Sequence, residues 1–438
     1  MRKNKKKQND YSIQKEDIKQ LSKRIAITVF ILLFYNLLTY VTIPGVNPHS
    51  LELLQKNTAL ETISLFSGGS FQTLSLLSLG VSAYISAQII VQLLQADVVP
   101  ILSEWSKQGQ VGRRKLTQTT RAIAGILAFV QSIGIIAGVT TLADEQFSVI
   151  NPIWDFIVVS ALMTAGTFIA LWLADQITDR GLGNGVSVII AAGIIKRLPM
   201  MVERFGHSIF RKGQVDWGKI AIAVVVVFLT VLLIVWFNRS EYRIRIQYSR
   251  RETLAPEDSY LPLKIIVSNV VPIIFASSIF TIPQTLLMFF KYHSRETWFR
   301  ITYSFFDLNS LSGIIMYAVL IVLFSYVYSL VQIQPERLAD NLLKQEAYIP
   351  GIYPGEGTAQ YIKDRLYDLD LPGAAFLMII SVVPMIISHF VEVDFQLGLT
   401  GSSVLIIVGV LSEIQRQIEG LRMKHNYAKI LDTHYVLD

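Results

Sequence analysis

Residues 62–96 read TISLFSGGSFQTLSLLSLGVSAYISAQIIVQLLQA, with no charged side chain between Glu61 and Asp97. As one helix this stretch would be about 52 Å long at 1.5 Å per residue, whereas the hydrocarbon core of a bilayer is about 30 Å thick. The stretch therefore has to break. We expect a glycine-broken re-entrant piece, a break near Leu76–Gly80, and then a firmer helix. Irregular backbone at membrane depth is tolerated only where protein covers it or water reaches it, so the stretch predicts a membrane protein that encloses a pathway.

The composition indicates the same class for the whole chain. Hydrophobic residues make up 52% of the sequence and charged residues 16%, against about 25% charged in soluble domains. Apolar runs of about twenty residues recur, and no cleavable signal peptide precedes the first of them. They predict an all-α, polytopic protein with ten spans, at roughly 25–43, 74–95, 119–141, 153–174, 186–203, 219–237, 264–290, 310–333, 371–391 and 398–415.

The net charge of +6 is explained by membrane orientation. Most of the 39 Lys and Arg residues fall in segments that share one side of the membrane if the N-terminus is cytoplasmic, and this asymmetry predicts that both termini are cytoplasmic. We therefore expect no direct nucleic-acid partner. The basic segment 1–24 is either a solvated tail or, from Ser12 onward, an amphipathic helix on the inner leaflet.

Catalytic and metal-binding chemistry is poorly represented. The chain has no cysteine, which excludes disulfides, thiolate metal sites and cysteine nucleophiles. No HExxH, GxSxG or Walker A motif occurs, and Gly181–Gly185 has the pattern of a helix entry rather than a nucleotide loop. The span interiors hold almost no ionisable residue, which disfavours an ion-coupled secondary transporter. We expect no enzyme activity and no cofactor.

Uncharged polar residues gather on the second span. Single residues of this kind usually form hydrogen bonds between helices, but their number here also favours a helix that faces a wet or mobile interface. They are Ser78, Ser82, Tyr84, Ser86, Gln88 and Gln92.

Two long loops on the predicted cytoplasmic side, 238–264 and 334–370, are candidates for a docking platform, with simple connectors as the alternative. Residues 241–251 alternate apolar and charged side chains, which predicts a short strand or hairpin. A proline- and glycine-rich turn at 349–358 precedes a short helix expected from Ala359 to about Tyr367.

Several motifs occur together in one order along the chain. They are Phe66-Ser-Gly-Gly69, Leu79-Gly-Val81, Gly109-Gln-Val-Gly-Arg-Arg-Lys115, Gln131-Ser-Ile-Gly134, Asp179-Arg-Gly-Leu-Gly-Asn-Gly185, Tyr260-Leu-Pro-Leu-Lys264, Pro335-Glu-Arg-Leu-Ala-Asp-Asn-Leu342 and Tyr348-Ile-Pro-Gly351. From about residue 20 to residue 430 the chain thereby resembles the SecY family of bacterial protein-translocation channels. No single motif decides the match; the ordered set does.

The resemblance implies two pseudo-symmetric halves of five spans, 25–203 and 204–418, between cytoplasmic tails at 1–24 and 419–438. A re-entrant plug helix would lie at about 65–76, including Phe66, Ser67, Gly68, Gly69, Ser70 and Phe71. A ring of aliphatic side chains would form the pore constriction: Val81, Ile85, Val186, Ile190, Ile274 and Ile406. Such a collar dewets and resists ions without imposing a fixed geometry on a passing chain.

The resemblance also implies a lateral gate between the second and third spans and the seventh and eighth. Gln92, Asn184 and Ser277 are the candidates for polar contacts near that gate. The candidates for motor or ribosome docking are Arg250, Arg251, Tyr353, Lys363 and Arg365.

Three positions depart from the family pattern. The chain has Ala83 where proline is usual, Thr400-Gly401 where a double glycine is usual, and Tyr353 where an arginine engages the motor ATPase. Tyrosine at that point resembles the accessory SecY proteins of some Gram-positive bacteria, which export a narrow set of substrates.

The implied function is that of the central subunit of a protein-conducting channel in the bacterial cytoplasmic membrane. It would translocate unfolded secretory proteins and release hydrophobic segments sideways. The implied partners are SecE-like and SecG-like small membrane subunits, a SecA-type motor, the ribosome, preproteins with signal sequences, and membrane lipid. A secondary transporter, a membrane-embedded assembly scaffold and an accessory SecY with few clients are the alternatives.

Overall fold

The computed structural model describes residues 2–43, 74–95, 99–142, 152–210, 217–248, 260–264, 270–289, 296–308, 310–391 and 401–434. The first part of the chain contains α1 (Arg2–Leu38), α3 (Ser82–Gln95), α4 (Pro100–Lys107), α5 (Gly109–Leu142), α6 (Pro152–Arg180) and α7 (Gly185–Phe210). The second contains α8 (Trp217–Arg239), β1 (Glu241–Arg245), β2 (Gln247–Tyr248), β3 (Tyr260–Lys264), α9 (Val271–Phe289), α10 (Thr297–Phe306), α11 (Leu311–Gln332), α12 (Pro335–Lys344), β4 (Ala347–Tyr348), α13 (Glu356–Val391) and α14 (Gly401–His434). We call α1–α7 the first half and α8–α14, with the strands, the second half.

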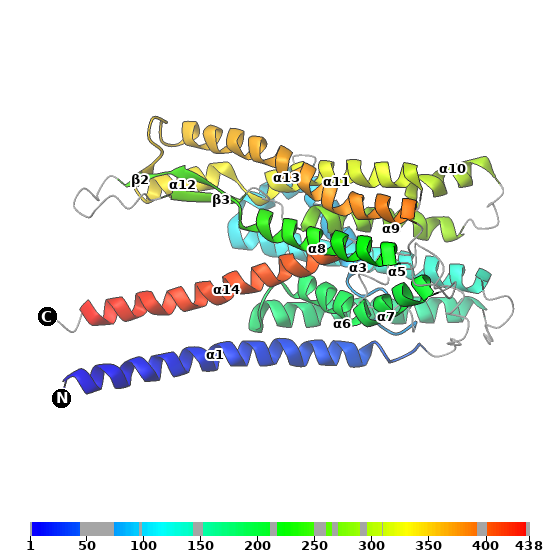
Figure 1. The fold of residues 1–438 in the computed structure, drawn as a ribbon, viewed down its shortest axis with the longest axis horizontal. Coiled ribbons are helices and arrows are strands. Elements are labelled where there is room, and N and C mark those ends of the chain that lie inside the picture. Colours follow the sequence, from blue (N-terminus) through cyan, green and yellow to red (C-terminus); the bar gives the residue numbers. More distant parts are fainter. Residues whose placement is uncertain are drawn as a thin grey trace.

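The long helices run roughly along one common axis (Figure 1). Both termini lie at the end of the bundle that also carries β2, β3 and α12, and α1 and α14 extend past the body of the molecule at that end. We call this end the platform end. Its position beside both termini agrees with the expected placement of the tails and the two long loops on one side.

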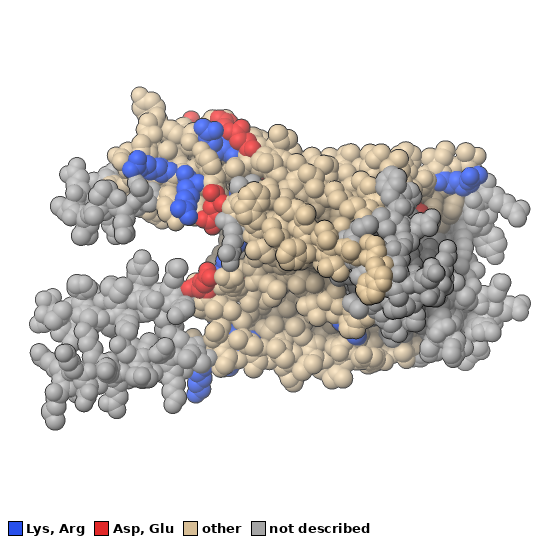
Figure 2. Space-filling model, viewed as in Figure 1, with Lys and Arg blue, Asp and Glu red and all other residues tan. Residues whose placement is uncertain are grey.

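The helices have the lengths and compositions of membrane spans. Within the described residues, five helices are long and apolar enough to cross a bilayer, and a bent pair, Ser82–Gln95 with Pro100–Ser106, would make a sixth. Val224–Asn238 and Val271–Gln284 are shorter apolar helices. Charged side chains gather at the platform end, whereas the middle of the same face is almost entirely uncharged (Figure 2). The ten-span count remains a prediction.

The predicted break in the opening stretch is confirmed. Residues 74–81 form turns, with positive φ at Leu74 (37°) and Gly80 (52°), and α3 begins only at Ser82. The predicted span 74–95 is therefore eight residues, about two helical turns, too long at its start. The proposed plug, including Phe66–Phe71, lies outside the described residues.

Two predicted boundaries disappear in the structure. The basic tail 1–24 and the first span form one continuous helix, α1, because no proline or glycine interrupts Arg2–Leu38. The short helix expected to end near Tyr367 instead continues as α13 through Pro372 and Pro384 to Val391. Packing against α11 and α12 supports α13 along its length, which outweighs the loss of a backbone hydrogen bond at each proline.

The two long loops fold into one small unit, which we call the platform. β1 pairs antiparallel with β3, and β2 pairs with β4, so that the loop after α8 is joined to the loop after α11. A hydrophobic cluster beneath the strands includes Ile244, Leu263, Leu342, Ile349 and Ile362. The strand prediction for residues 241–251 is thereby confirmed for β1 and β2.

Candidate functional site

The predicted pore-ring residues all belong to, or pack against, one large hydrophobic cluster. Val81, Ile85, Ile190, Ile274 and Ile406 belong to the largest buried hydrophobic cluster, and Val186 packs against it while partly buried. The exposed fractions of the five buried residues run from 0% at Val81 to 7% at Ile274. These residues come from the start of α3 and from α7, α9 and α14, so both halves contribute aliphatic side chains to the cluster. That the six form a pore ring remains a prediction.

Helical spacing places the four residues of the first half in two pairs. Val81 and Ile85 are four positions apart, as are Val186 and Ile190, and residues at this spacing share one face of a helix. α3 contacts α9, and α7 contacts α14, so each pair of positions in the first half meets a helix of the second half.

The start of α3 is fixed from two sides. Thr42 and Ser75 form an antiparallel bridge, and the amide of Leu76 donates to the carbonyl of Val41 at 2.9 Å. On the other side, a Cβ placed on Gly166 of α6 would lie 1.8 Å from the carbonyl oxygen of Leu76. Glycine is therefore required there for the turn to reach α6, and this close approach sets where Val81 and Ile85 point.

The start of α7 is fixed by its cap. The side-chain oxygen of Asn184 accepts hydrogen bonds from the amides of Val186 (3.1 Å) and Ser187 (3.5 Å), as an N-cap residue does. The amide of Gly185 donates to Thr178 Oγ1 at 2.9 Å, which ties the turn back to α6. The expected helix entry at Gly181–Gly185 is confirmed, and Asn184 caps α7.

The helices of the expected lateral gate are in contact. α3 and α5 pack against α9, and α3 also touches α11; we call this surface the lateral contact. Ser277 of α9 shares a 2.9 Å hydrogen bond with the hydroxyl of Tyr317 on α11, a bond inside the second half. Gln92 is partly buried on α3. Roles for Gln92, Asn184 and Ser277 in gating remain predictions.

The serines of the second span turn back to their own backbone. Ser78 Oγ donates to Ser75 O, Ser82 Oγ to Leu79 O, and Ser86 Oγ to Ser82 O, and all three side chains are buried. Local bonds of this kind satisfy a hydroxyl without any partner helix. They allow polar residues to lie at buried positions of this segment.

The docking candidates lie on the platform where they are described. Tyr353 is 88% exposed. Arg365 stacks 5.2 Å from the ring centre of Tyr361 and pairs with Asp368 at 3.1 Å, and Lys363 is exposed. Arg250 and Arg251 lie outside the described residues.

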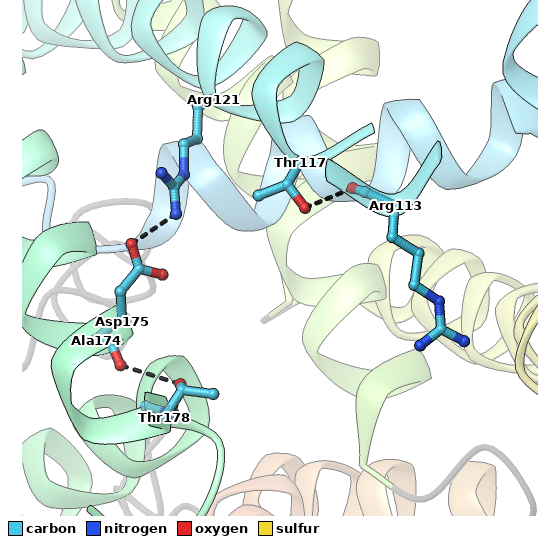
Figure 3. Close-up of polar contacts among 7 residues, drawn as sticks. Arg113, Thr117, Arg121, Ala174, Asp175 and Thr178 are labelled. Carbon is cyan, nitrogen blue, oxygen red and sulfur yellow. Dashed lines mark hydrogen bonds and ion pairs between the residues drawn. The ribbon is translucent and has the colours of Figure 1, made fainter. Parts of the chain in front are cut away.

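Charged side chains near the lateral contact form a second feature. Arg121 of α5 and Asp175 of α6 make an ion pair of 2.6 Å, while Arg113, two turns earlier on α5, points away from it (Figure 3). Both partners of the pair are 45% exposed, so it contributes about 0–1 kcal/mol. Over the described residues, no group of three or more His, Asp or Glu side chains is arranged to hold a metal ion.

Sequence reasoning did not find two hydrogen bonds between the halves. Arg337 Nη2 of α12 donates to the carbonyl of Ser106 on α4 at 2.8 Å. The amide of Gly183 donates to Gln417 Oε1 of α14, also at 2.8 Å. Arg337 and Gly183 both stand in the ordered motifs, but each bond joins positions more than two hundred residues apart to a partner that no local pattern marks.

Several helices long and apolar enough to cross a bilayer, with a folded platform at one end, define a multi-pass membrane protein. The chain belongs to the SecY family, which it matches over residues 75–415.

Curated relatives agree with this assignment. The chain is 51% identical to "Protein translocase subunit SecY 2" of Lactobacillus kefiranofaciens subsp. kefiranofaciens, over 93% of this chain and 100% of the relative. It is 43% identical to "Protein translocase subunit SecY 1" of the same organism, over 93% and 96%. The match to "Protein translocase subunit SecY" of Streptococcus gordonii is also 43%, over 95% and 97%.

Solved structures show the same fold at low sequence identity. "The structure of a protein conducting channel" matches with a TM-score of 0.67 and 16% identity, over 92% of this chain and 93% of that one. "Sec61 in the Canine ribosome-channel complex from the endoplasmic reticulum" matches with 0.63 and 16%, over the same shares. The expectation of a SecY-type helical fold is confirmed.

Proposed function

We propose that this chain is the central subunit of a protein-conducting channel. It translocates unfolded secretory proteins across the bacterial cytoplasmic membrane and releases hydrophobic segments laterally into the lipid. The observation that carries the proposal is one large hydrophobic cluster to which both halves contribute. Val81, Ile85, Ile190, Ile274 and Ile406 belong to this cluster, and Val186 packs against it. The names of the relatives support it.

The geometry suits the task physically. Val81, Ile85, Ile190, Ile274 and Ile406 are all buried, and a ring of such side chains would exclude water and ions from the constriction while the channel is closed. An extended chain can displace such side chains without specific polar contacts. The lateral contact of α3 and α5 with α9 is a non-covalent joint, so an apolar segment can leave between these helices, driven by about 25 cal/mol for each Å² that it buries.

Site-specific cross-linking tests the channel directly. The chain has no native cysteine, so Ile85→Cys and Ile274→Cys each give a single reactive thiol. A stalled preprotein carrying a thiol-reactive group is expected to attach at both positions and not at Val319→Cys, which is 55% exposed on α11. Cross-linking at Val319→Cys without cross-linking at Ile85→Cys or Ile274→Cys would contradict the proposal that these two residues line the pore.

The proposed partners follow from the platform and the family. The platform, with Lys363 and Arg365 on α13 and exposed Tyr353 before it, would receive a SecA-type motor or the ribosome on the cytoplasmic side. SecE-like and SecG-like subunits would bind within the membrane. Both termini would be cytoplasmic, since they lie at the platform end. The Sec61 structure named above is a ribosome-bound complex, which supports the ribosome proposal.

A second candidate is an accessory SecY with a narrow set of clients. The chain is closer to the relative named SecY 2 (51%) than to SecY 1 of the same organism (43%), and Tyr353 replaces the arginine expected to engage the motor. Export of a broad panel of preproteins by a strain that depends on this chain would exclude the accessory role; export of one or a few would support it.

The Tyr353→Arg substitution tests whether this position affects motor docking without affecting the stability of the fold. Because Tyr353 is 88% exposed, the substitution should leave the unfolding temperature unchanged. It should increase stimulation of a SecA-type ATPase by the reconstituted channel. Lys363→Gln removes a positive charge from the same platform, whereas Tyr353→Arg adds one, so Lys363→Gln should reduce that stimulation. Equal ATPase rates in all three proteins would contradict a docking role for this face.

A further inference from the structure

The hydrogen bond from Arg337 Nη2 to Ser106 O lies where the lateral contact meets the platform. α11 ends at Gln332 and α12 begins at Pro335, so Arg337 follows a gate helix almost directly. On the other side, α4 follows α3 after a short connection, and the two helices meet at 98°. The bond therefore joins the extensions of two helices, α3 and α11, that touch each other across the lateral contact.

Ser106 is firmly attached to the first half. α4 packs with Leu102 and Trp105 in a cluster that includes Val91 of α3 and Leu116 of α5. A Cβ on Gly112 of α5 would lie 1.8 Å from the carbonyl oxygen of Trp105, so the end of α4 touches the backbone of α5. The carbonyl of Ser106 thus moves with α3 and α5.

Arg337 is equally attached to the second half. Ala339 and Leu342 of α12 are buried, and Leu342 belongs to the core of the platform. α12 also packs on α13. If α3 and α5 separate from α9 and α11, the 2.8 Å bond between Arg337 and Ser106 has to break.

The electrostatics of the contact favour the bonded state. Arg337 is the third residue of α12, near the helix N-terminus, where the helix dipole disfavours a positive charge. Ser106 is in the last turn of α4, where carbonyl groups lack partners inside the helix and the dipole favours a cation. The guanidinium of Arg337 therefore points away from the N-terminus of α12, which disfavours its charge. It binds at the C-terminus of α4, which favours that charge.

We propose that Arg337 is a latch residue that holds the lateral contact closed at the platform end, and that its bond to Ser106 opens when an apolar segment enters. This inference rests on the proposed function, because it assigns a role within a channel that opens laterally. A binding partner on α12 that withdraws Arg337 would favour the open state, which links the platform to the gate.

A distance measurement tests the latch without any transport. Spin labels at Glu104→Cys on α4 and Asp340→Cys on α12, both at exposed positions, report the separation of the halves in the full chain in lipid nanodiscs. Arg337→Gln should lengthen or broaden the distance distribution. Arg337→Lys, which keeps a charged donor, should restore part of the closed population. Removing a bond of this kind changes such an equilibrium by about tenfold.

Two controls isolate the bond. Lys344→Gln removes the same charge from the other end of α12 and should leave the distances unchanged. Ser106→Ala should also have no effect, because the acceptor is the backbone carbonyl. If Arg337→Gln gives the same distances as Lys344→Gln, the latch is wrong.

Transport supplies the second readout. Arg337→Gln should raise translocation of a preprotein with a weakened signal sequence by about tenfold, as a more easily opened gate requires. An unchanged signal requirement would overturn the latch. If even the unsubstituted chain moves no preprotein, the channel function fails, while the distance measurement still decides the latch.

Discussion

The amide of Gly183 donates a 2.8 Å hydrogen bond to Gln417 Oε1, which joins the turn between α6 and α7 to α14. Gly183 has φ of +82°, and a Cβ there would approach Val188 and Ile414 to about 3 Å. The same turn is bound by α1, because Thr28 Oγ1 accepts the amide of Leu182 at 3.0 Å. Three parts of the chain thus meet in one glycine turn, at a boundary of the halves distinct from the lateral contact.

Gln417→Ala should weaken this second boundary. Loss of the bond leaves the buried amide of Gly183 without its acceptor, which costs about 1 kcal/mol. The expected result is a lower unfolding temperature in lipid, measured by a thermal shift assay. Gln415→Ala, whose side chain bonds only locally to Glu419 in the same helix, is the matched control. Equal unfolding temperatures for the two variants would show that the Gly183 bond does not stabilise the fold.

Ile406→Asn should open the central seal. Ile406 is 6% exposed in the aliphatic cluster, so asparagine places an amide where nothing polar is expected to pair with it and attracts water. Ion conductance across planar bilayers should rise, and the demand on signal sequences should fall. Leu411→Asn, on the same helix but 58% exposed, should leave both unchanged. If the Ile406→Asn variant has wild-type ion conductance, Ile406 only packs against its neighbours and does not seal the channel.

Gly166→Ala should disturb the entry to α3. The added Cβ would lie 1.8 Å from Leu76 O, so α6 or the turn has to move, at a cost of about 1–3 kcal/mol. The shift displaces Val81 and Ile85, and the variant should both unfold at lower temperature and leak ions. Gly420→Ala, where a Cβ meets nothing within 4 Å, is the control and should be neutral or slightly stabilising. A stable, tight Gly166→Ala channel would contradict the anchoring of this turn on α6.

The parts of the fold that the sequence predicts are those with a local physical signal. The absence of charge in residues 62–96, set against bilayer thickness, was enough to place the break before Ser82. The alternation of apolar and charged side chains in residues 241–251 was enough to predict strand β1. The length of α13 was harder to predict. Pro372 carries a local signal for a helix boundary, but α13 continues through it, packed against α11 and α12.

The candidate site likewise has features that the local sequence predicts and features that it does not. The four-residue spacing of Val81 with Ile85 and of Val186 with Ile190 is visible in the sequence, but their meeting with Ile274 and Ile406 was expected only from the family resemblance. Contacts to main-chain atoms leave no trace in side-chain patterns. Arg337 and Gln417 therefore escaped notice, since the partners of both are backbone groups of distant turns.

The two hydrogen bonds between the halves use different kinds of groups on their two sides, and this difference has an evolutionary consequence. In both of these joints the first half supplies a peptide group and the second half supplies the side chain, so substitutions in the first half leave the bonding atoms in place. Under the proposed latch, substitution of Arg337 alone would change how easily the lateral contact opens, and substitution of Gln417 alone would change the stability of the other boundary, with the first half unaltered. A duplicated gene could in this way specialise for a new set of exported proteins in very few mutational steps.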